Sequence, residues 1–346
     1  MSVARKAKDS SWVHLSDDDL LKVRIQDLGV SISGSEIQPR VRQLHHELAE
    51  KGLLFRPVCY LSDEWLSPDG QGAIGIPFFL AHPRLKALEF RMMFEVEGGT
   101  ASSCMRLLRH EAGHAFDHSY RLHQRQDWQE VFGSPRLAYH PHLYSADPRS
   151  TEHVRNLPDN YAQSHPSEDF AETFAVWLNP YSQWRTRYRG WPAMRKLRYV
   201  DRLMREVTAR PLPRRTPRLD FEARATQARL RSYYERKFRL YRVGDLSSAV
   251  QDLKGIFTLS RAARIEHPAS ALIRKNKRLL VESVSAWSGQ KPGEVARVVA
   301  RLAKLCDEHR LAVRDEPAAA LVRVSAYVST LSVNRMRTHR YETRRP

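Results

Sequence analysis

The sequence contains little cysteine and no long apolar segment. Its three cysteines, Cys59, Cys104 and Cys306, are scattered over 346 residues without CxxC spacing. This argues against a disulfide framework and against a zinc site built from thiolates. No run of about 18 apolar residues is present, so no transmembrane segment is expected. The opening residues, MSVARKAKDSSWVHLSDDD, lack the apolar stretch of a secretory signal. These absences favour a cytoplasmic protein.

Acidic residues are also scarce, with 39 Asp and Glu against 57 Lys and Arg and a net charge of +18. The imbalance is concentrated in residues 211–346, which hold 29 basic and 13 acidic residues, a net charge of +16; residues 1–210 carry only +2. Such an asymmetry indicates a surface for nucleic acid or another polyanion. An arginine-rich solvated helical surface is the alternative interpretation, and both stay open here.

Proline and charge together predict the domain organisation. The run Pro211-Leu-Pro-Arg-Arg-Thr-Pro217 favours an extended linker and lies where the charge composition changes. We therefore predict a polar N-terminal lead, a first folded domain, a Pro/Arg-rich linker and a basic helical domain, at residues 1–20, 21–210, 211–219 and 220–346. Periodicity and turn residues predict helices at 36–51, 100–118 and 167–178, strands at 55–61 and 73–80, and four or five helices beyond the linker.

Residues His110-Glu111-Ala112-Gly113-His114 form an HExxH motif. On an α-helix the two histidines are one turn apart on the same face, so both can bind one metal ion. Glu111 lies beside them, where a carboxylate can take a proton from water. Apolar residues on both sides of the motif are typical of a buried active-site helix. The alternative is a pair of histidines that merely flank a helix.

Two glutamates, Glu168 and Glu172, are one helical turn apart in the stretch SEDFAETF. Catalytic zinc takes three protein ligands and keeps one open position. We predict that Glu168 is the third ligand and that Glu172 accepts the free ring N–H of a ligating histidine. The reverse assignment of the two glutamates stays open, as does a solvated pair without a metal.

His118 is the closest rival of Glu168 as the third ligand, because it is one further turn along the same helix. A helix rarely supplies three tetrahedral ligands from successive turns, since the third lies too far along the axis. The extended HExxHxxGxxH pattern is also absent. Eight of the 15 histidines lie between His110 and His165. We interpret the remaining ones as the lining of a loop over the cleft.

The order HExxH followed by a helical ExxxE is the gluzincin arrangement. The stretch HPSEDFAETFAVWLNP, residues 165–180, closely resembles the bacterial putative zinc-binding metallopeptidases, and IPFFLAHPRL, residues 76–85, is similar to the strand before their zinc helix. The resemblance covers roughly residues 21–205. It implies a zincin-like domain with a small mixed sheet, an HExxH helix and an ExxxE helix. The helices and basic charge predicted beyond the linker lie outside the resemblance, and together the two parts predict an α+β fold with an all-α basic C-terminal region. The resemblance also implies one Zn²⁺ per chain.

The motif spacing is also similar to that of anthrax lethal factor and the Pro-Pro endopeptidases. Those enzymes have a tyrosine seven residues before the ligand glutamate and an aspartate three residues after the second histidine, and here these positions are Tyr161 and Asp117. The resemblance implies that Tyr161 donates its O–H to the developing oxyanion. It also implies that Asp117 orients the ligand side chains without binding the metal itself. A loop tyrosine that covers the cleft is the alternative for Tyr161.

The sequence therefore predicts a zinc metallopeptidase that hydrolyses a peptide or protein substrate with Glu111 as general base. We expect the substrate backbone to lie along residues 73–80 by strand addition. The alternative is a nucleic-acid-associated protein with a structural or vestigial zinc site, or a protease recruited to nucleic acid by residues 212–346. Glu111 argues against a purely structural site, because such a site needs no carboxylate between its histidines.

Overall fold

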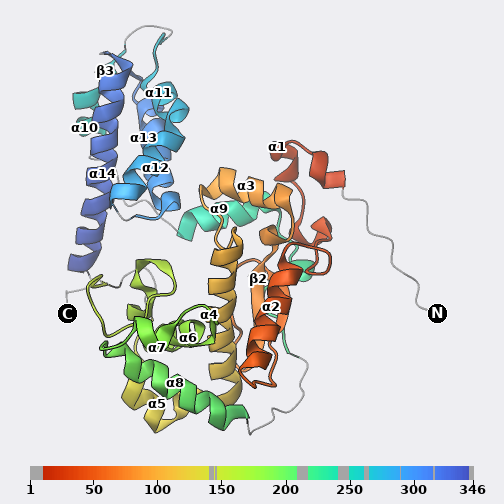
Figure 1. Cartoon of the computed structure of the whole chain (residues 1–346). Coiled ribbons are helices and arrows are strands. Elements are labelled where there is room, and N and C mark those ends of the chain that lie inside the picture. The colour runs from red at the N-terminus through yellow and green to blue at the C-terminus, as the bar shows by residue number, and fades with distance from the viewer. Residues whose placement is uncertain are drawn as a thin grey trace. The chain divides into compact units, whose positions relative to one another are not determined.

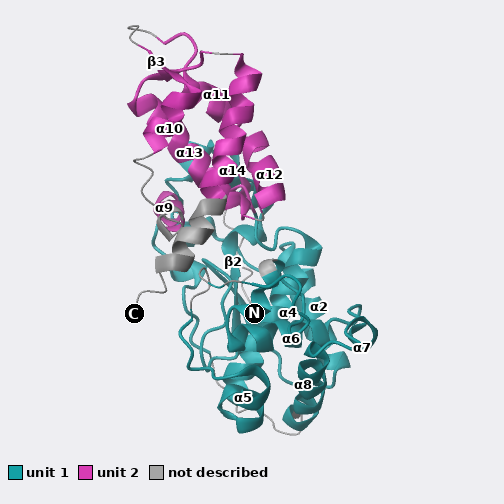
Figure 2. Cartoon of the chain, turned by 90° about the vertical axis from the view of Figure 1, so that its left-hand side faces the viewer, with its two compact units in different colours: residues 1–88, 96–230 teal, residues 89–95, 231–346 magenta. Residues whose placement is uncertain are grey.

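The computed structural model describes residues 11–139, 144, 146–208, 217–240, 249–260, 265–288, 290–314 and 316–342. The chain divides into two compact units (Figure 2). Unit 1 consists of residues 1–88 and 96–230, and unit 2 consists of residues 89–95 and 231–346. Most of the predicted linker lies outside the described residues, and the four-part domain division stays a prediction.

Unit 1 is mostly helical and contains one small sheet (Figure 1). Its 3₁₀-helices are η1 Ser11–His14, η2 Ile25–Leu28, η3 Phe78–Ala81, η4 Leu122–Gln124, η5 Pro158–Gln163 and η6 Ala223–Ala225. Its α-helices are α1 Asp17–Leu20, α2 Ile37–Glu50, α4 Ala101–Tyr120, α5 Gln126–Phe132, α6 Pro166–Leu178, α7 Trp184–Arg187 and α8 Ala193–Thr208. Helix α3, Pro83–Met93, and helix α9, Leu230–Leu240, each begin in unit 1 and continue in unit 2.

The three helices predicted before the linker are confirmed as α2, α4 and α6, with their ends moved by one or two residues. Helix α4 begins after Thr100, whose hydroxyl accepts a hydrogen bond from the Ser103 backbone N–H. Such a cap satisfies one of the free N–H groups of the first turn. Helix α6 ends at Leu178, because Pro180 disfavours helical backbone in the residue before it.

The sheet of unit 1 pairs β1, Val58–Ser62, in parallel with β2, Ala73–Pro77. Strand β2 is fully buried. It is shorter than the predicted strand 73–80, because the chain turns at Pro77 into η3. Proline has no N–H to continue a ladder, which explains why the pairing stops there. Helices with a small sheet agree with the α+β class at this coarse level.

Unit 2 packs its helices around a core of its own (Figure 1). Beyond α9, its elements are α10 Ala249–Ile256, β3 Thr258–Leu259, α11 Ala269–Lys275, α12 Lys277–Ser288, α13 Pro292–Glu308, β4 Leu311–Ala312 and α14 Pro317–Glu342. The apolar stripe of α13 is buried in this core. The expectation of an all-α region is wrong in one detail, because β3 and β4 form a short antiparallel pair. Among the described residues, six α-helices follow the linker rather than four or five helices.

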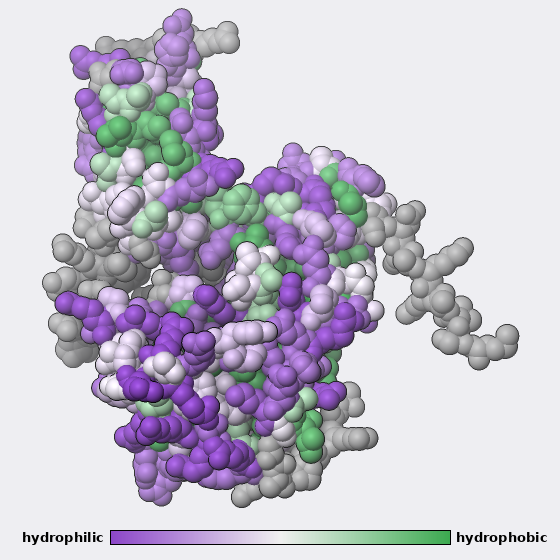
Figure 3. Space-filling view, in the orientation of Figure 1, coloured by the Kyte–Doolittle hydropathy of each residue, from purple (hydrophilic) through white to green (hydrophobic). Residues whose placement is uncertain are grey.

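Hydrophobic side chains are exposed on both units, among a mostly hydrophilic surface (Figure 3). The most exposed large apolar residues of unit 2 are Leu259, Leu279, Trp287 and Val322. In the part of the chain that the structure describes, no helix has the length and apolar character that a membrane crossing requires.

Candidate metal centre

Helices α4 and α6 pack closely at Gly113, the fourth residue of the HExxH motif. A Cβ atom added there would lie 2.8 Å from Ala171 Cα and 3.2 Å from the Ala171 carbonyl oxygen. Only glycine therefore allows the two backbones this approach. The contact brings the histidine-bearing face of α4 against the glutamate-bearing face of α6.

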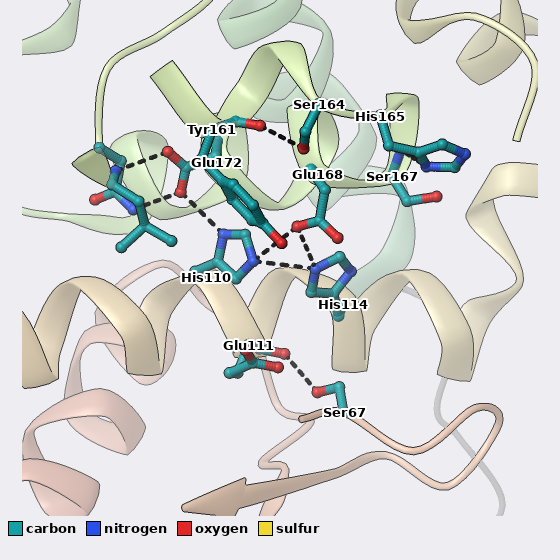
Figure 4. A network of polar contacts seen from close by, with 12 residues as sticks. Ser67, His110, Glu111, His114, Tyr161, Ser164, His165, Ser167, Glu168 and Glu172 are labelled. Carbon is teal, nitrogen blue, oxygen red and sulfur yellow. Dashed lines mark hydrogen bonds and ion pairs between the residues drawn. The ribbon is translucent and has the colours of Figure 1, made fainter. Parts of the chain in front are cut away.

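Three potential metal ligands meet between these helices (Figure 4). His110 Nε2 and His114 Nε2 are 3.1 Å apart, and Glu168 Oε2 lies 3.1 Å from the first and 3.2 Å from the second. These three residues form the one group of potential metal ligands found among the described residues. A triangle of this size has a common point about 2 Å from each corner, which matches Zn–N and Zn–O bond lengths. The donor set of two imidazoles and one carboxylate therefore fits zinc.

Glu172 lies behind His110, on the side of the ring that faces away from Glu168. Its Oε1 atom is 2.9 Å from His110 Nδ1. Since a carboxylate only accepts hydrogen bonds, Nδ1 carries the proton, and Nε2 is the nitrogen that faces the other two donors. Asn156 Nδ2 and the Leu157 backbone N–H also donate to Glu172, at 2.8 and 2.7 Å. Three donors thus hold this buried carboxylate in place.

The charges at the centre favour a cation. Burial opposes protonation of His110, but Glu168 and Glu172 outweigh it and raise the pKa of that imidazole. Burial also opposes ionisation of Glu168, but His114 and His110 lower the pKa of its carboxyl. The carboxylates therefore favour positive charge between them, which a divalent metal ion would supply when bound.

The loop between β1 and β2 contacts the backbone of Glu111. Its backbone carbonyl accepts a 2.9 Å hydrogen bond from Ser67 Oγ, in the loop between β1 and β2 (Figure 4). The Glu111 side chain is buried, and burial raises the pKa of its carboxyl. A carboxylate whose proton affinity is raised in this way is a better base.

Tyr161, in η5, extends toward the ligand atoms of His110, His114 and Glu168 (Figure 4). Its ring centre lies 5.8 Å from that of His110. Its hydroxyl is 2.7 Å from the hydroxyl of Tyr139. Burial, together with the charge of Glu168, raises the pKa of the Tyr161 phenol, so the hydroxyl keeps its proton at neutral pH.

The structure does not bring Asp117 to the ligands. Its carboxylate accepts from the His123 backbone N–H at 2.7 Å and lies 3.2 Å from His123 Nδ1. His118 stacks on His114, with ring centres 5.9 Å apart, but is not part of the ligand group. His165 caps the start of α6. His140 and His142 lie outside the described residues.

The site contains three residues that the sequence did not single out: Gly113, Asn156 and Tyr139. A glycine inside a predicted helix signals a close backbone approach, so Gly113 could have been found. Asn156 and Tyr139 lie in irregular segments without periodicity, and no local pattern links them to Glu172 or Tyr161.

The predicted strand addition along residues 73–80 is wrong. The edge of β2 away from β1 is occupied at Gly75, whose N–H donates to the Leu66 carbonyl at 2.8 Å and whose carbonyl accepts from the Leu66 N–H at 3.4 Å. The Ala73 carbonyl on the same edge accepts from Ser67 Oγ. A substrate backbone therefore finds no free edge there.

Comparison with known proteins agrees with this geometry. No curated protein and no solved structure matches the chain, and the lethal-factor resemblance stays a prediction. Residues 103–203 match the model of a protein family described as "Putative zinc-binding metallo-peptidase". The matched segment holds most of α4, all of α6 and the three candidate ligands. Residues 103–203 are therefore similar to the putative zinc-binding metallopeptidase family that the motifs predicted.

Proposed function

We propose that the protein is a zinc-dependent metallopeptidase of the gluzincin type, with a zincin-like catalytic layout and one zinc ion per chain. The observation that carries the proposal is the triangle of donor atoms from His110, His114 and Glu168, with the buried Glu111 beside it. Glu172 supports the same assignment from its contact with His110 Nδ1. When bound, zinc would polarise the reacting carbonyl and lower the pKa of a water ligand toward neutrality.

The residues around the ligands supply the remaining chemistry. Glu111 acts as general base: it accepts a proton from the attacking water and passes it to the leaving nitrogen. Tyr161 donates its hydroxyl to the oxyanion that develops on the scissile carbonyl, an interaction that is stronger in the transition state than in the bound substrate. The substrate is a peptide or protein.

Metal analysis tests the ligand assignment. The purified protein should contain about one zinc ion per chain, and His110→Ala, His114→Ala and Glu168→Ala should each lose it. His118→Ala is the matched control: it removes a histidine one turn beyond His114 and should keep the metal. Zinc loss in His118→Ala but not in Glu168→Ala would contradict the assignment. Zinc loss in Glu172→Ala alone would reverse the two glutamates.

Cleavage of a peptide library tests the reaction. Wild-type protein should hydrolyse members of the library, and Glu111→Gln should keep its zinc but lose hydrolysis, because the base is not a ligand. Hydrolysis by Glu111→Gln at the wild-type rate would contradict the mechanism. A zinc-loaded wild type that cleaves no peptide would contradict the function.

The net charge of +16 on residues 211–346 favours a second function. We propose that the basic helical region, residues 212–346, binds a polyanion such as nucleic acid and thereby recruits the peptidase. This function is independent of the metal centre, and its test is given at the scale of the whole molecule below.

A further inference from the structure

A second tyrosine hydroxyl lies beside the proposed oxyanion donor. Tyr139 Oη is 2.7 Å from Tyr161 Oη, a short distance for a hydrogen bond between two hydroxyls. Burial and the nearby Glu168 carboxylate raise the pKa of the Tyr139 phenol as well, so both hydroxyls keep their protons at neutral pH.

Tyr139 is held in place by the same helix end that presents Glu168. His165 Nδ1 accepts from the Ser167 backbone N–H at 3.1 Å, at the start of α6. The ring proton is therefore on His165 Nε2, which donates to the Leu137 carbonyl at 3.1 Å. The Tyr139 ring meets the His165 ring edge to face, with centres 5.3 Å apart. Residues 137–139 are thus anchored to the N-terminus of α6.

The number of protons in the pair dictates the direction of its hydrogen bond during the reaction. Each phenol has one hydroxyl proton. When Tyr161 donates its proton to the oxyanion, the hydrogen bond between the two hydroxyls can only run from Tyr139 to Tyr161. Negative charge then grows on the Tyr161 oxygen, and a donor aimed at that oxygen stabilises it. Hydrogen bonds in such a chain strengthen one another.

We propose that Tyr139 is a positioning residue for the peptidase reaction: its hydroxyl donates to Tyr161, orients the Tyr161 hydroxyl toward the scissile carbonyl and makes it a stronger donor. This inference rests on the proposed function of the metal centre. In this role Tyr139 acts on the reaction through Tyr161; its hydroxyl also lies near the Glu168 carboxylate, and burial together with that carboxylate raises the pKa of its phenol.

A double-mutant cycle on the full-length zinc-loaded chain tests the inference, with a fluorogenic peptide that the library selects. Tyr161→Phe should lower kcat by roughly 10- to 1,000-fold, as for the loss of one oxyanion donor. Tyr139→Phe removes only the oxygen and keeps the ring against His165; we expect kcat to fall about 3- to 30-fold with KM nearly unchanged. In the Tyr161→Phe background, Tyr139→Phe should have no further effect.

A spectroscopic readout tests the pair without activity. In the full chain labelled with ¹³C at the tyrosine Cζ, the Tyr161 resonance is the one missing from Tyr161→Phe. Tyr139→Phe should shift that resonance, because it removes the hydrogen-bond partner. Tyr181→Phe, which changes a tyrosine that is 82% exposed, should leave it unchanged.

The outcomes separate this inference from the proposed function. Independent losses in the double variant, or an unshifted Tyr161 resonance in Tyr139→Phe, overturn the positioning role while the peptidase assignment stands. A wild type without hydrolysis overturns the peptidase assignment and this role with it. A Tyr161→Phe variant with wild-type kcat overturns the oxyanion role on which Tyr139 depends, even if the resonance shifts.

Discussion

Gly113 shows how one small residue controls the approach of two helices. A Cβ atom at this position would lie 2.8 Å from Ala171 Cα, a backbone atom that cannot move alone. We expect Gly113→Ala to push α6 away from α4, to lower the free energy of unfolding by about 1–3 kcal/mol and to weaken zinc binding roughly tenfold or more. Chemical denaturation and zinc competition with a chelator measure the two effects.

Gly255 offers the control for this substitution. It is also inside a helix, α10, but a Cβ atom there would have no neighbour within 4 Å. Because alanine is a better helix former than glycine, Gly255→Ala should be neutral or stabilise the protein by up to about 1 kcal/mol. Equal effects of the two substitutions would show that helix propensity, and not the α4–α6 contact, dominates at Gly113.

His153 predicts a pH dependence of stability. Burial, assisted by Lys196, lowers its pKa from 6.5 to about 4. Between these two values the unfolded chain binds more protons than the folded one, so the free energy of unfolding rises with pH from 4 to 6.5. This difference costs the folded state at most about 3 kcal/mol below pH 4 and nothing at neutral pH, where the imidazole is neutral in both states. His153→Gln should remove the cost at acid pH and flatten the dependence in that window. Identical slopes for both proteins, measured by denaturation at several pH values, would contradict the prediction.

At the scale of the elements, a buried ion pair joins α2 to α4. Arg109 donates two hydrogen bonds to Glu47, at 2.7 and 2.6 Å, and both residues are at most 5% exposed. Removal of one partner leaves a buried charge uncompensated. We therefore expect Arg109→Met to lower the free energy of unfolding by about 3–5 kcal/mol.

The double variant Glu47→Met/Arg109→Met separates pairing from packing. With both charges gone, most of the lost stability should return, because no charge stays buried alone. Chemical denaturation of the two variants provides the comparison. A double variant that is as unstable as Arg109→Met would instead assign the loss to the packing of the arginine side chain.

At the scale of the whole molecule, the charge asymmetry predicts salt-dependent binding of a polyanion. Full-length protein should bind a duplex DNA oligonucleotide, with an affinity that falls steeply as the salt concentration rises, because neutralised phosphates release their counterions. The full chain is the proper sample, since residues 89–95 pack with residues 231–346 in unit 2 and a fragment that starts at residue 212 would lack them.

A matched pair of charge variants locates the binding surface. The quadruple substitution of exposed basic residues in unit 2 by glutamine, at Arg231, Lys254, Lys275 and Arg314, should weaken binding and flatten the salt dependence. The same change at four exposed arginines of unit 1, Arg42, Arg106, Arg189 and Arg198, should have little effect. If fluorescence anisotropy gave the same affinity and the same salt dependence for both variants, the basic region would be a solvated surface and not the binding site.

Local spacing determined which side chains could act together within one element. Helical periodicity alone predicts that His110 and His114 share one face of α4, and Glu168 and Glu172 one face of α6. Helix ends were also predictable to within two residues, because caps and prolines act over a few neighbours. Periodicity failed at Pro77, where the apolar run continues although the strand has ended.

Only the tertiary structure decided how those faces meet. The contact of Glu168 with His114 spans 54 residues of sequence, and it depends on the close approach at Gly113. The tertiary structure also directs Glu172 to His110 Nδ1, Asp117 to His123 and Tyr139 to Tyr161. It also places Leu66 on the edge of β2 where a substrate was expected. A sequence pattern predicts the spacing of side chains along one element. These contacts arise instead from the packing of separate segments, which no local pattern predicts.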